Sequence, residues 1–148
     1  MGLIYAELEL INGEDIILAR RHIIGEEEIK RIHVNVLVDT GSMYMCINEN
    51  VRELLQVPTI AKRKGQLANG EIVECDVVGP IEVRFKNRLC HVDAMVLPGG
   101  NELLLGAIPM EDLDVIIHPS RQELDVNPES PDMAMMKLKK CLPMKRAA

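Results

Sequence analysis

Four consecutive residues place a carboxylate, a hydroxyl, a glycine and a second hydroxyl in succession, at Asp39, Thr40, Gly41 and Ser42. A carboxylate can take up or donate a proton during catalysis, and neighbouring hydroxyls can donate hydrogen bonds to it. Gly41 allows a backbone path that a residue with a Cβ would resist. The simpler interpretation is that Asp39 only begins a turn, as Asp commonly does.

The segment before this turn has the pattern of a strand. Apolar side chains at Ile32, Val34, Val36 and Val38 alternate with the residues between them, which predicts a strand with one buried face. The strand is expected to end at Asp39, so that the carboxylate lies at the start of a tight turn.

The composition bounds the class of protein. The chain has 148 residues, enough for one domain, and its 47% hydrophobic and 27% charged residues are typical of a soluble globular protein. A net charge of −6 argues against a nucleic-acid partner. Glu7 and Glu9 interrupt any apolar leader near the N-terminus, and no apolar run approaches membrane-spanning length. We therefore expect a cytoplasmic protein with no membrane partner.

The cysteines do not form a recognisable metal or disulfide pattern. They are Cys46, Cys75, Cys90 and Cys141, and none lies in a Cys-x-x-Cys pair. Buried free thiols in a reducing compartment are the expected state. A zinc site using Cys90, His91 and His118 is the alternative, but this spacing fits no zinc pattern. We expect no metal and no cofactor.

The N-terminal part is predicted to be mostly β-structure. Residues 3–11 alternate as a half-buried strand, and Asn12-Gly13 is a strong signal for a two-residue hairpin turn. Residues 15–20 would then form the returning strand. Residues 25–28, with three glutamates, are predicted to be an exposed loop.

After the Asp39 turn we expect a short strand over residues 43–47 and then a helix. Asn48 suits the N-cap of this helix, which must end before Pro58. Asn69-Gly70 lies between two strand-like runs and predicts a projecting hairpin over residues 66–78. The basic residues 62–64 before it are interpreted as a solvated edge.

The second half continues the β pattern. Gly79-Pro80 is predicted to break the chain. Leu104 and Leu105 belong to a buried run that ends at Gly106. The expected elements are strands at 81–86, 90–96, 115–117 and 123–126 and a short helix at 107–113.

The composition changes beyond residue 127. From Glu129 onward there are five basic residues against two acidic ones, together with several methionines and prolines. We expect residues 1–127 to form the domain. Residues 128–148 would be a Met-rich basic tail, either flexible or docked on a partner subunit.

These elements, in this order, resemble the retropepsin-type aspartic peptidases, particularly the small single-lobe members from bacteria. The resemblance covers residues 3–127. Asp39-Thr40-Gly41-Ser42 matches the catalytic motif, and residues 67–72 match the flap. Leu104-Leu105-Gly106 matches the hydrophobic-hydrophobic-Gly motif beside the catalytic loop, and residues 107–113 match the family's helix. The resemblance implies an all-β, retropepsin-like acid protease barrel with one or two short helices and an active site at a homodimer interface.

The resemblance also implies roles for individual residues. Aspartic peptidases use two carboxylates that share one proton, one acting on the attacking water and the other on the scissile carbonyl. The chain holds a single Asp-Thr-Gly, so Asp39 would have to meet Asp39 of a second copy. Thr40 would bond across the two-fold axis, and Gly41 would keep the two loops close.

Three further features follow from the resemblance. Ala68, Asn69 and Gly70, at the tip of the flap, would close over a peptide or protein substrate. Ser42, where many retroviral members have Ala, would add a hydrogen bond to Asp39. The flap contains less glycine than retroviral flaps do.

The expected activity is therefore that of an aspartic endopeptidase acting on peptide bonds. Two other hypotheses stay open. The same fold could form a non-catalytic dimer that binds a peptide or protein. Alternatively, the basic tail could occupy the acidic cleft and keep the enzyme latent.

Overall fold

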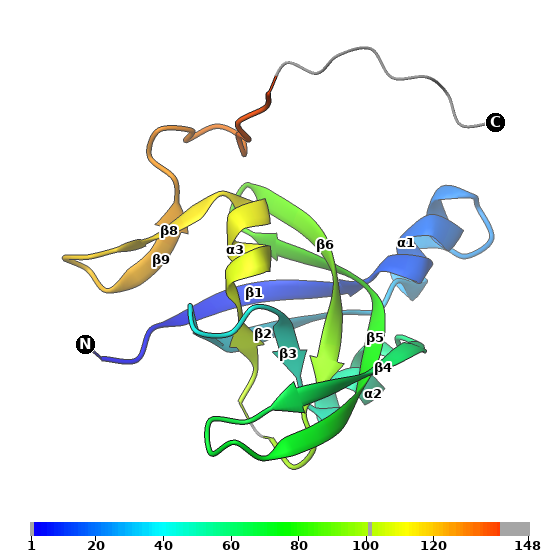
Figure 1. Cartoon of the computed structure of the whole chain (residues 1–148). Coiled ribbons are helices and arrows are strands. Elements are labelled where there is room, and N and C mark those ends of the chain that lie inside the picture. Colours follow the sequence, from blue (N-terminus) through cyan, green and yellow to red (C-terminus); the bar gives the residue numbers. More distant parts are fainter. Residues whose placement is uncertain (1, 101, 140–148) are drawn as a thin grey trace.

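The computed structural model describes residues 2–100 and 102–139 and shows a β-barrel with short helices around it (Figure 1). Seven strands form one sheet in the order β1-β2-β7-β3-β6-β5-β4, and an additional pairing of β1 with β5 closes six of them into a barrel. The strands of this sheet are β1 (Tyr5–Asn12), β2 (Arg31–Val38), β3 (Met45–Ile47), β4 (Thr59–Gln66), β5 (Ile72–Phe85), β6 (Arg88–Val96) and β7 (Leu104–Leu105).

Alternating side chains fill the barrel, as the sequence pattern predicted. In β2, Val36 and Val38 are buried, and Ile32 and Val34 are half-buried against the same core. Phe85 is the only aromatic side chain among the described residues of this core, which is otherwise built from aliphatic, methionine and cysteine side chains. Burying a Val, Leu, Ile, Phe or Met side chain stabilises the fold by about 1.5–3 kcal/mol.

The prediction of a hairpin at Asn12-Gly13 and of a returning strand at 15–20 is wrong. The chain forms helix α1 (Gly13–Arg20) instead. Asn12 is its N-cap, because the side-chain oxygen of Asn12 accepts a hydrogen bond from the backbone N–H of Asp15 at 3.1 Å. The amide nitrogen of Asn12 also donates to the carbonyl of Leu55 at 2.8 Å, which fixes the buried side chain in this orientation. The predicted loop at 25–28 contains a short 3₁₀ helix, η1 (Glu26–Glu28).

The predicted break at Gly79-Pro80 is also wrong. Strand β5 runs through this dipeptide, and its pairing with β6 shifts register between Val78 and Ile81. A bulge of this kind lets a proline lie within a strand without losing a ladder hydrogen bond. The first half of β5 pairs with β4 and the second half with β1, so the two halves serve different parts of the sheet.

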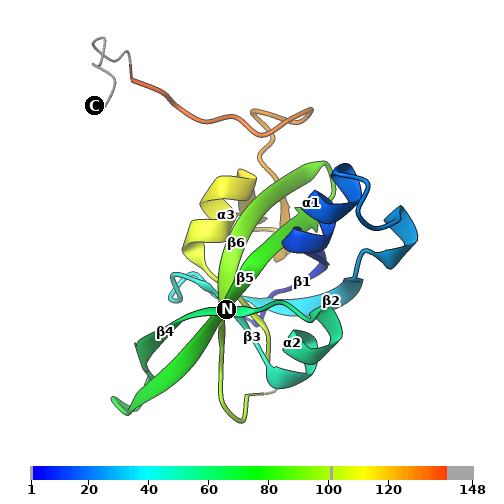
Figure 2. The same cartoon turned by 90° about the vertical axis from the view of Figure 1, so that its right-hand side faces the viewer.

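Most of the remaining elements lie where the sequence placed them. Helix α2 (Glu49–Leu55) begins at the Asn48 cap, helix α3 (Ala107–Leu113) follows Gly106, and β8 (Val115–His118) pairs with β9 (Glu123–Val126). The hairpin of β4 and β5 extends from one end of the barrel (Figure 2).

The all-β, retropepsin-like fold is confirmed. The described residues contain three short α-helices, one more than the upper expectation, and the extra helix is α1. No helix in the described part of the chain is long and apolar enough to cross a membrane.

Part of the basic tail lies among the described residues. Ser130 is buried, and the backbone N–H of Met135 donates to Asp114 at the end of α3, so this part packs on the chain's own barrel. Met133 and Met136 are exposed. The predictions for residues 140–148 of the tail, and for Cys141 within it, fall outside the described residues.

Candidate active site

Asp39 follows directly after β2 and is held there by its backbone. β2 runs parallel to β7, with Val38 opposite Leu105, and the N–H of Asp39 donates to the carbonyl of Leu105 at 3.0 Å. The two segments that the sequence singled out, residues 39–42 and 104–106, therefore lie side by side.

The turn after Asp39 is closed by the carboxylate itself. Its Oδ1 accepts a hydrogen bond from the N–H of Gly41 at 3.0 Å, and the N–H of Ser42 donates to the carbonyl of Asp39 at 3.1 Å. Asp39 is half-buried, whereas Thr40 is exposed. Among the described residues of this single chain, the hydroxyl of Thr40 has no hydrogen-bond partner.

Gly106 brings the start of α3 against the loop. The N–H of Ala107 donates to the carbonyl of Ser42 at 2.8 Å, and the N–H of Ile108 donates to that of Met43 at 3.0 Å. A Cβ on Gly106 would lie 2.5–2.7 Å from three backbone atoms of residues 42–44. Only glycine fits at this contact.

The structure places the hydroxyl of Ser42 away from the position expected from the resemblance. Its Oγ donates to the carbonyl of Tyr44 at 3.4 Å and lies within reach of the buried thiol of Cys46. Burial raises the pKa of the Cys46 thiol, and the neighbouring hydroxyl of Ser42 offsets part of this rise. The hydrogen bond expected from Ser42 to Asp39 is not made among the described residues.

Ala68, Asn69 and Gly70 lie at the exposed tip of the β4–β5 hairpin. The N–H of Gly70 donates to the carbonyl of Leu67 at 2.8 Å, and the side chain of Asn69 accepts from the N–H of Glu71 at 2.9 Å. The φ of Gly70 is +87°, which explains the glycine. Within the described residues of this single chain, no hydrogen bond joins the tip to the Asp39 loop.

An apolar cluster lies between this hairpin and the strands that flank Asp39. Its buried members are Cys46 of β3, Cys75 of β5 and Met95 of β6. We name it the cleft cluster, and its half-buried members are Tyr44, Val73, Val77, Leu97 and Leu104. It is separate from the barrel core and belongs to the outer face of the strands.

The candidate zinc ligands point in different directions. Cys90 is buried in the barrel core, whereas Nε2 of His91 is paired with Glu82 on the outer face at 2.9 Å. His118 lies in β8, where its Nδ1 is 3.1 Å from the hydroxyl of Ser120. Among the described residues, no three His, Cys, Asp or Glu side chains gather as a metal site would require.

Two long-range contacts were not visible in the sequence. The first joins the hairpin to the loop between β2 and β3, because the guanidinium of Arg63 in β4 stacks on the ring of Tyr44, 4.6 Å from its centroid. No helix or strand period relates Arg63 to Tyr44, so the sequence pattern did not predict their contact. The basic residues 62–64 were the only indication that this strand is charged.

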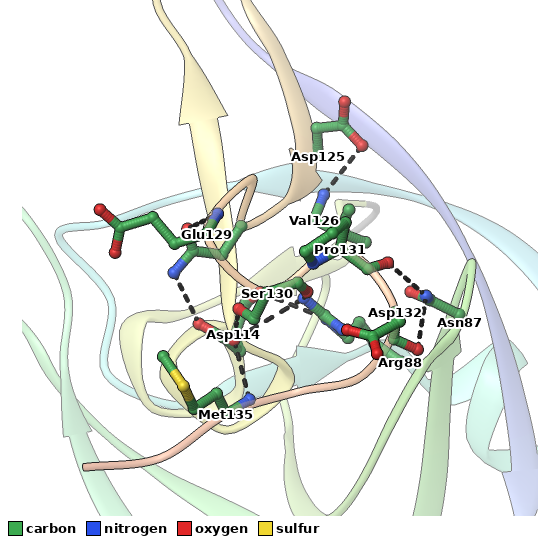
Figure 3. Close-up of polar contacts among 11 residues, drawn as sticks. Asn87, Arg88, Asp114, Asp125, Val126, Glu129, Ser130, Pro131, Asp132 and Met135 are labelled. Carbon is green, nitrogen blue, oxygen red and sulfur yellow. Dashed lines mark hydrogen bonds and ion pairs between the residues drawn. The ribbon is translucent and has the colours of Figure 1, made fainter.

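The second contact attaches the chain beyond β9 to the barrel (Figure 3). Asp114, at the end of α3, accepts hydrogen bonds from Ser130, Asn127 and the N–H of Met135. These bonds, led by that of Ser130, lower the pKa of Asp114 to about 2. Arg88, which is fully buried, donates to the carbonyl of Ser130, and its Nη1 has no partner among the described residues.

A closed six-stranded barrel with an Asp-Thr-Gly turn braced by a glycine at the start of a helix defines the class of retropepsin-like acid proteases. The family model described as "Aspartyl protease" matches residues 26–123, more than half of the chain. The chain therefore belongs to the aspartyl protease family. No curated protein matches it.

One solved structure with a TM-score above 0.5 has the same fold, and two others are similar at lower scores. The retroviral protease-like domain of Ddi1 from Leishmania major is 13% identical, with a TM-score of 0.51 over 86% of this chain and 90% of that one. The EIAV protease in complex with the inhibitor HBY-793 is 23% identical, with a TM-score of 0.42 over 55% of this chain and 77% of that one. A Legionella pneumophila protein of unknown function, Lpg0085, is 13% identical with a TM-score of 0.39, over 76% and 89% of the two chains.

Proposed function

We propose that the protein is an aspartic endopeptidase that hydrolyses peptide bonds with a water activated by Asp39 and by Asp39 of a second copy. Membership of the aspartyl protease family supports a protease. The observation that carries the residue assignment is the turn at Asp39, whose following loop accepts backbone hydrogen bonds from Ala107 and Ile108, at a close approach that only Gly106 permits.

The chemistry requires the second copy. An ionised carboxylate takes a proton from the attacking water, and a protonated one donates to the carbonyl oxygen as it gains negative charge. Two carboxylates a few ångströms apart cannot both ionise readily, so the pair holds one proton. A single chain supplies one such aspartate, and a two-fold axis beside Asp39 would supply the other.

The exposed side of the turn supports this arrangement. Thr40 presents its hydroxyl to solvent without a partner among the described residues, so it is free to bond to the loop of a second copy. The loop between β2 and β3 and the β8–β9 hairpin lie on the same side of the barrel in Figure 1. We propose this side as the dimer interface.

The β4–β5 hairpin would be the flap. Its tip, at Ala68, Asn69 and Gly70, would close over the substrate and exclude water from the two carboxylates. A peptide would lie extended between the hairpin and the catalytic loops and pair its backbone with the hairpin. The cleft cluster beneath would favour apolar side chains near the scissile bond. Cys46, Cys75 and Cys90 are free and buried, which supports a reducing location such as the cytoplasm.

The test combines mass with activity. The solution mass of the wild type and of Asp39→Asn is measured, and both are incubated with an unfolded protein mixture from mildly acidic to neutral pH. Cleavage by a wild-type dimer, absent from an equally dimeric Asp39→Asn, is the expected result. Asn keeps the shape of Asp39 but can neither ionise nor share a proton, so the comparison isolates the carboxylate.

Two other outcomes would redirect the assignment. A strict monomer that does not cleave would contradict the shared pair of carboxylates. A dimer that never cleaves would leave either a peptide-binding module or a latent enzyme. Deleting residues after Asn127 separates the last two, because only a latent enzyme gains activity when its tail is removed.

A further inference from the structure

Arg63 lies on the face of the hairpin that points toward the cleft cluster. It pairs directly with Cys75 across β4 and β5, and directly opposed residues in a sheet lie on the same face. Cys75 belongs to the cleft cluster. Lys62 and Lys64 are the residues next to Arg63 in the strand, so they point to the opposite face. One cation of the basic strand therefore faces the cleft, and two face away from it.

The contacts of these cations differ in the same way. Nζ of Lys62 is 3.5 Å from Glu74 and 3.8 Å from Asp76, so its charge is compensated within the hairpin. Arg63 has no carboxylate within ion-pair distance among the described residues. Its guanidinium rests on the ring of Tyr44, which leaves the N–H groups at its edge available to a ligand.

Arg63 and Tyr44 line a hollow of about 280 Å³ beside the catalytic loop. Val77 and Met95 of the cleft cluster and Ile108 of α3 contribute apolar side chains to its lining. Its volume lies just below the range of sites for whole small-molecule ligands and suits a single side chain.

Two other titratable groups line the same hollow, His91 and Asp93 of β6. Both lie on the same face of β6 as Met95. Along the strand, Asp93 is about 7 Å from Met95 and His91 is about 13 Å from it. His91 is paired with Glu82, and the carboxylate of Asp93 lies against the backbone of Gly79. Asp93 adjoins Ala94, which pairs with Met45, so it lies near Tyr44, but its carboxylate is turned toward Gly79. Among the described residues no ion pair joins this carboxylate to Arg63, so the guanidinium keeps an uncompensated charge in the hollow.

We infer that Arg63, positioned by Tyr44, forms a subsite that selects peptides carrying an aspartate or glutamate side chain a few residues from the scissile bond. The inference rests on the proposed function for its ligand, a peptide lying in the cleft. A planar guanidinium matches a carboxylate through two parallel hydrogen bonds, and stacking on an aromatic ring holds it in place before the ligand arrives.

A purely structural role for the stack would have different consequences. If Arg63 only fastened the hairpin to the catalytic loop, its loss would weaken binding of all peptides alike. A subsite instead changes the ratio between acidic peptides and their amide counterparts. The ratio of Glu to Gln at one peptide position is therefore the quantity to measure.

The experiment uses full-length Asp39→Asn, so that binding is read without cleavage. The immobilised protein is mixed with decapeptides that have two central leucines and random residues elsewhere, and the retained peptides are sequenced. We expect Asp and Glu to be enriched at one position by roughly tenfold or more over Asn and Gln, since a hydrogen bond to a charged group is stronger than one between neutral groups.

Three variants in the same background assign the effect. Arg63→Gln is expected to abolish the enrichment, Arg63→Glu to replace it by a preference for Lys and Arg, and the matched control Lys62→Gln to leave it unchanged. Absence of acidic enrichment, failure to retain any peptide, or equal loss in the Lys62 control would overturn the inference.

The wild type is incubated with the same peptide mixture to judge the proposed function separately. Cleavage by the wild type without acidic enrichment in Asp39→Asn would keep the function and discard the subsite. Acidic enrichment that depends on Arg63, without any cleavage by the wild type, would keep the subsite and discard the peptidase.

Discussion

Replacing Gly106 by alanine tests whether the backbone contact between α3 and the Asp39 loop sets the geometry of the site. The added Cβ would lie 2.5 Å from the carbonyl oxygen of Tyr44 and 2.7 Å from that of Ser42, where ordinary contacts are about 3.5–4 Å. The loop or the helix start must therefore move by about 1 Å. The φ of Gly106 is −88°, which alanine adopts readily, so the effect is steric alone.

The cost in stability follows from the size of this displacement. Overpacking at a fixed backbone contact costs about 1–3 kcal/mol, and the lower chain entropy of unfolded alanine returns about 0.4–1 kcal/mol. A net loss of about 1–2 kcal/mol is expected, which lowers the melting temperature by several degrees. A 1 Å misplacement of a reacting group can cost about a hundredfold in rate, so activity should fall far more than stability.

Thermal unfolding, solution mass and kcat/KM of Gly106→Ala would be compared with two controls. Gly65→Ala places its Cβ only against the end of the Met95 side chain, at 3.4 Å, and should unfold like the wild type. Val51→Ala removes buried carbons beneath α2 and should lose a similar 1–2 kcal/mol while keeping wild-type kcat/KM. Wild-type stability and activity in Gly106→Ala would refute the reasoning, as would a loss of activity no greater than that of Val51→Ala.

Three shorter predictions follow from other contacts. Asn12→Ala should lower the free energy of unfolding by about 1–2 kcal/mol, because it removes the cap of α1. Asn12→Ser also loses the donor to Leu55 but keeps a cap oxygen, so it should lose less in urea unfolding, and equal losses would contradict the cap. The pKa of Asp114 is about 2 in the folded chain, below its ordinary value of 3.8 in an unfolded chain, so its stabilising effect is present above pH 4 and disappears as the pH falls toward 2. The difference in urea midpoint between wild type and Asp114→Asn should therefore shrink over that range, and a constant difference would count against this role of Asp114. Thr40→Val should leave the melting temperature of the isolated chain near that of the wild type but weaken dimerisation, measured by sedimentation equilibrium. Thr40→Ser, which keeps the hydroxyl, should dimerise like the wild type. An unchanged dimer in Thr40→Val would remove Thr40 from the proposed interface.

The sequence predicted those parts of the fold that short-range patterns determine. The alternation before Asp39, the Asn48 cap and the Asn69-Gly70 turn each lie within a few residues, and each appears in the structure as expected. Asn12-Gly13 is equally local but ambiguous, because asparagine suits a hairpin turn and a helix N-cap alike. Its hydrogen bond to Leu55, 43 residues away, selects the helix, and no local pattern contains that partner.

In the candidate site, too, the short motifs could be predicted from the sequence and the long-range contacts could not. The motif at Asp39 and the glycine at 106 were visible as strings of residues, and the parallel pairing of β2 with β7 brings them together. The contacts of Arg63 with Tyr44 and of Arg88 with Asp114 join residues 19 and 26 positions apart, in strands, loops and helix ends with no common period. Such pairs depend on how the barrel closes, which single-sequence patterns do not specify.

The contact between α3 and the loop after Asp39 has a consequence for how such a protein can change over generations. Its two hydrogen bonds run from the N–H groups of Ala107 and Ile108 to the carbonyls of Ser42 and Met43, and none uses a side chain. The side chains of Met43 and Tyr44 are therefore free to vary without disturbing the position of the carboxylate. Under the proposed function, substitutions at these residues would redirect which peptides are recognised, whereas Gly106 has no such freedom.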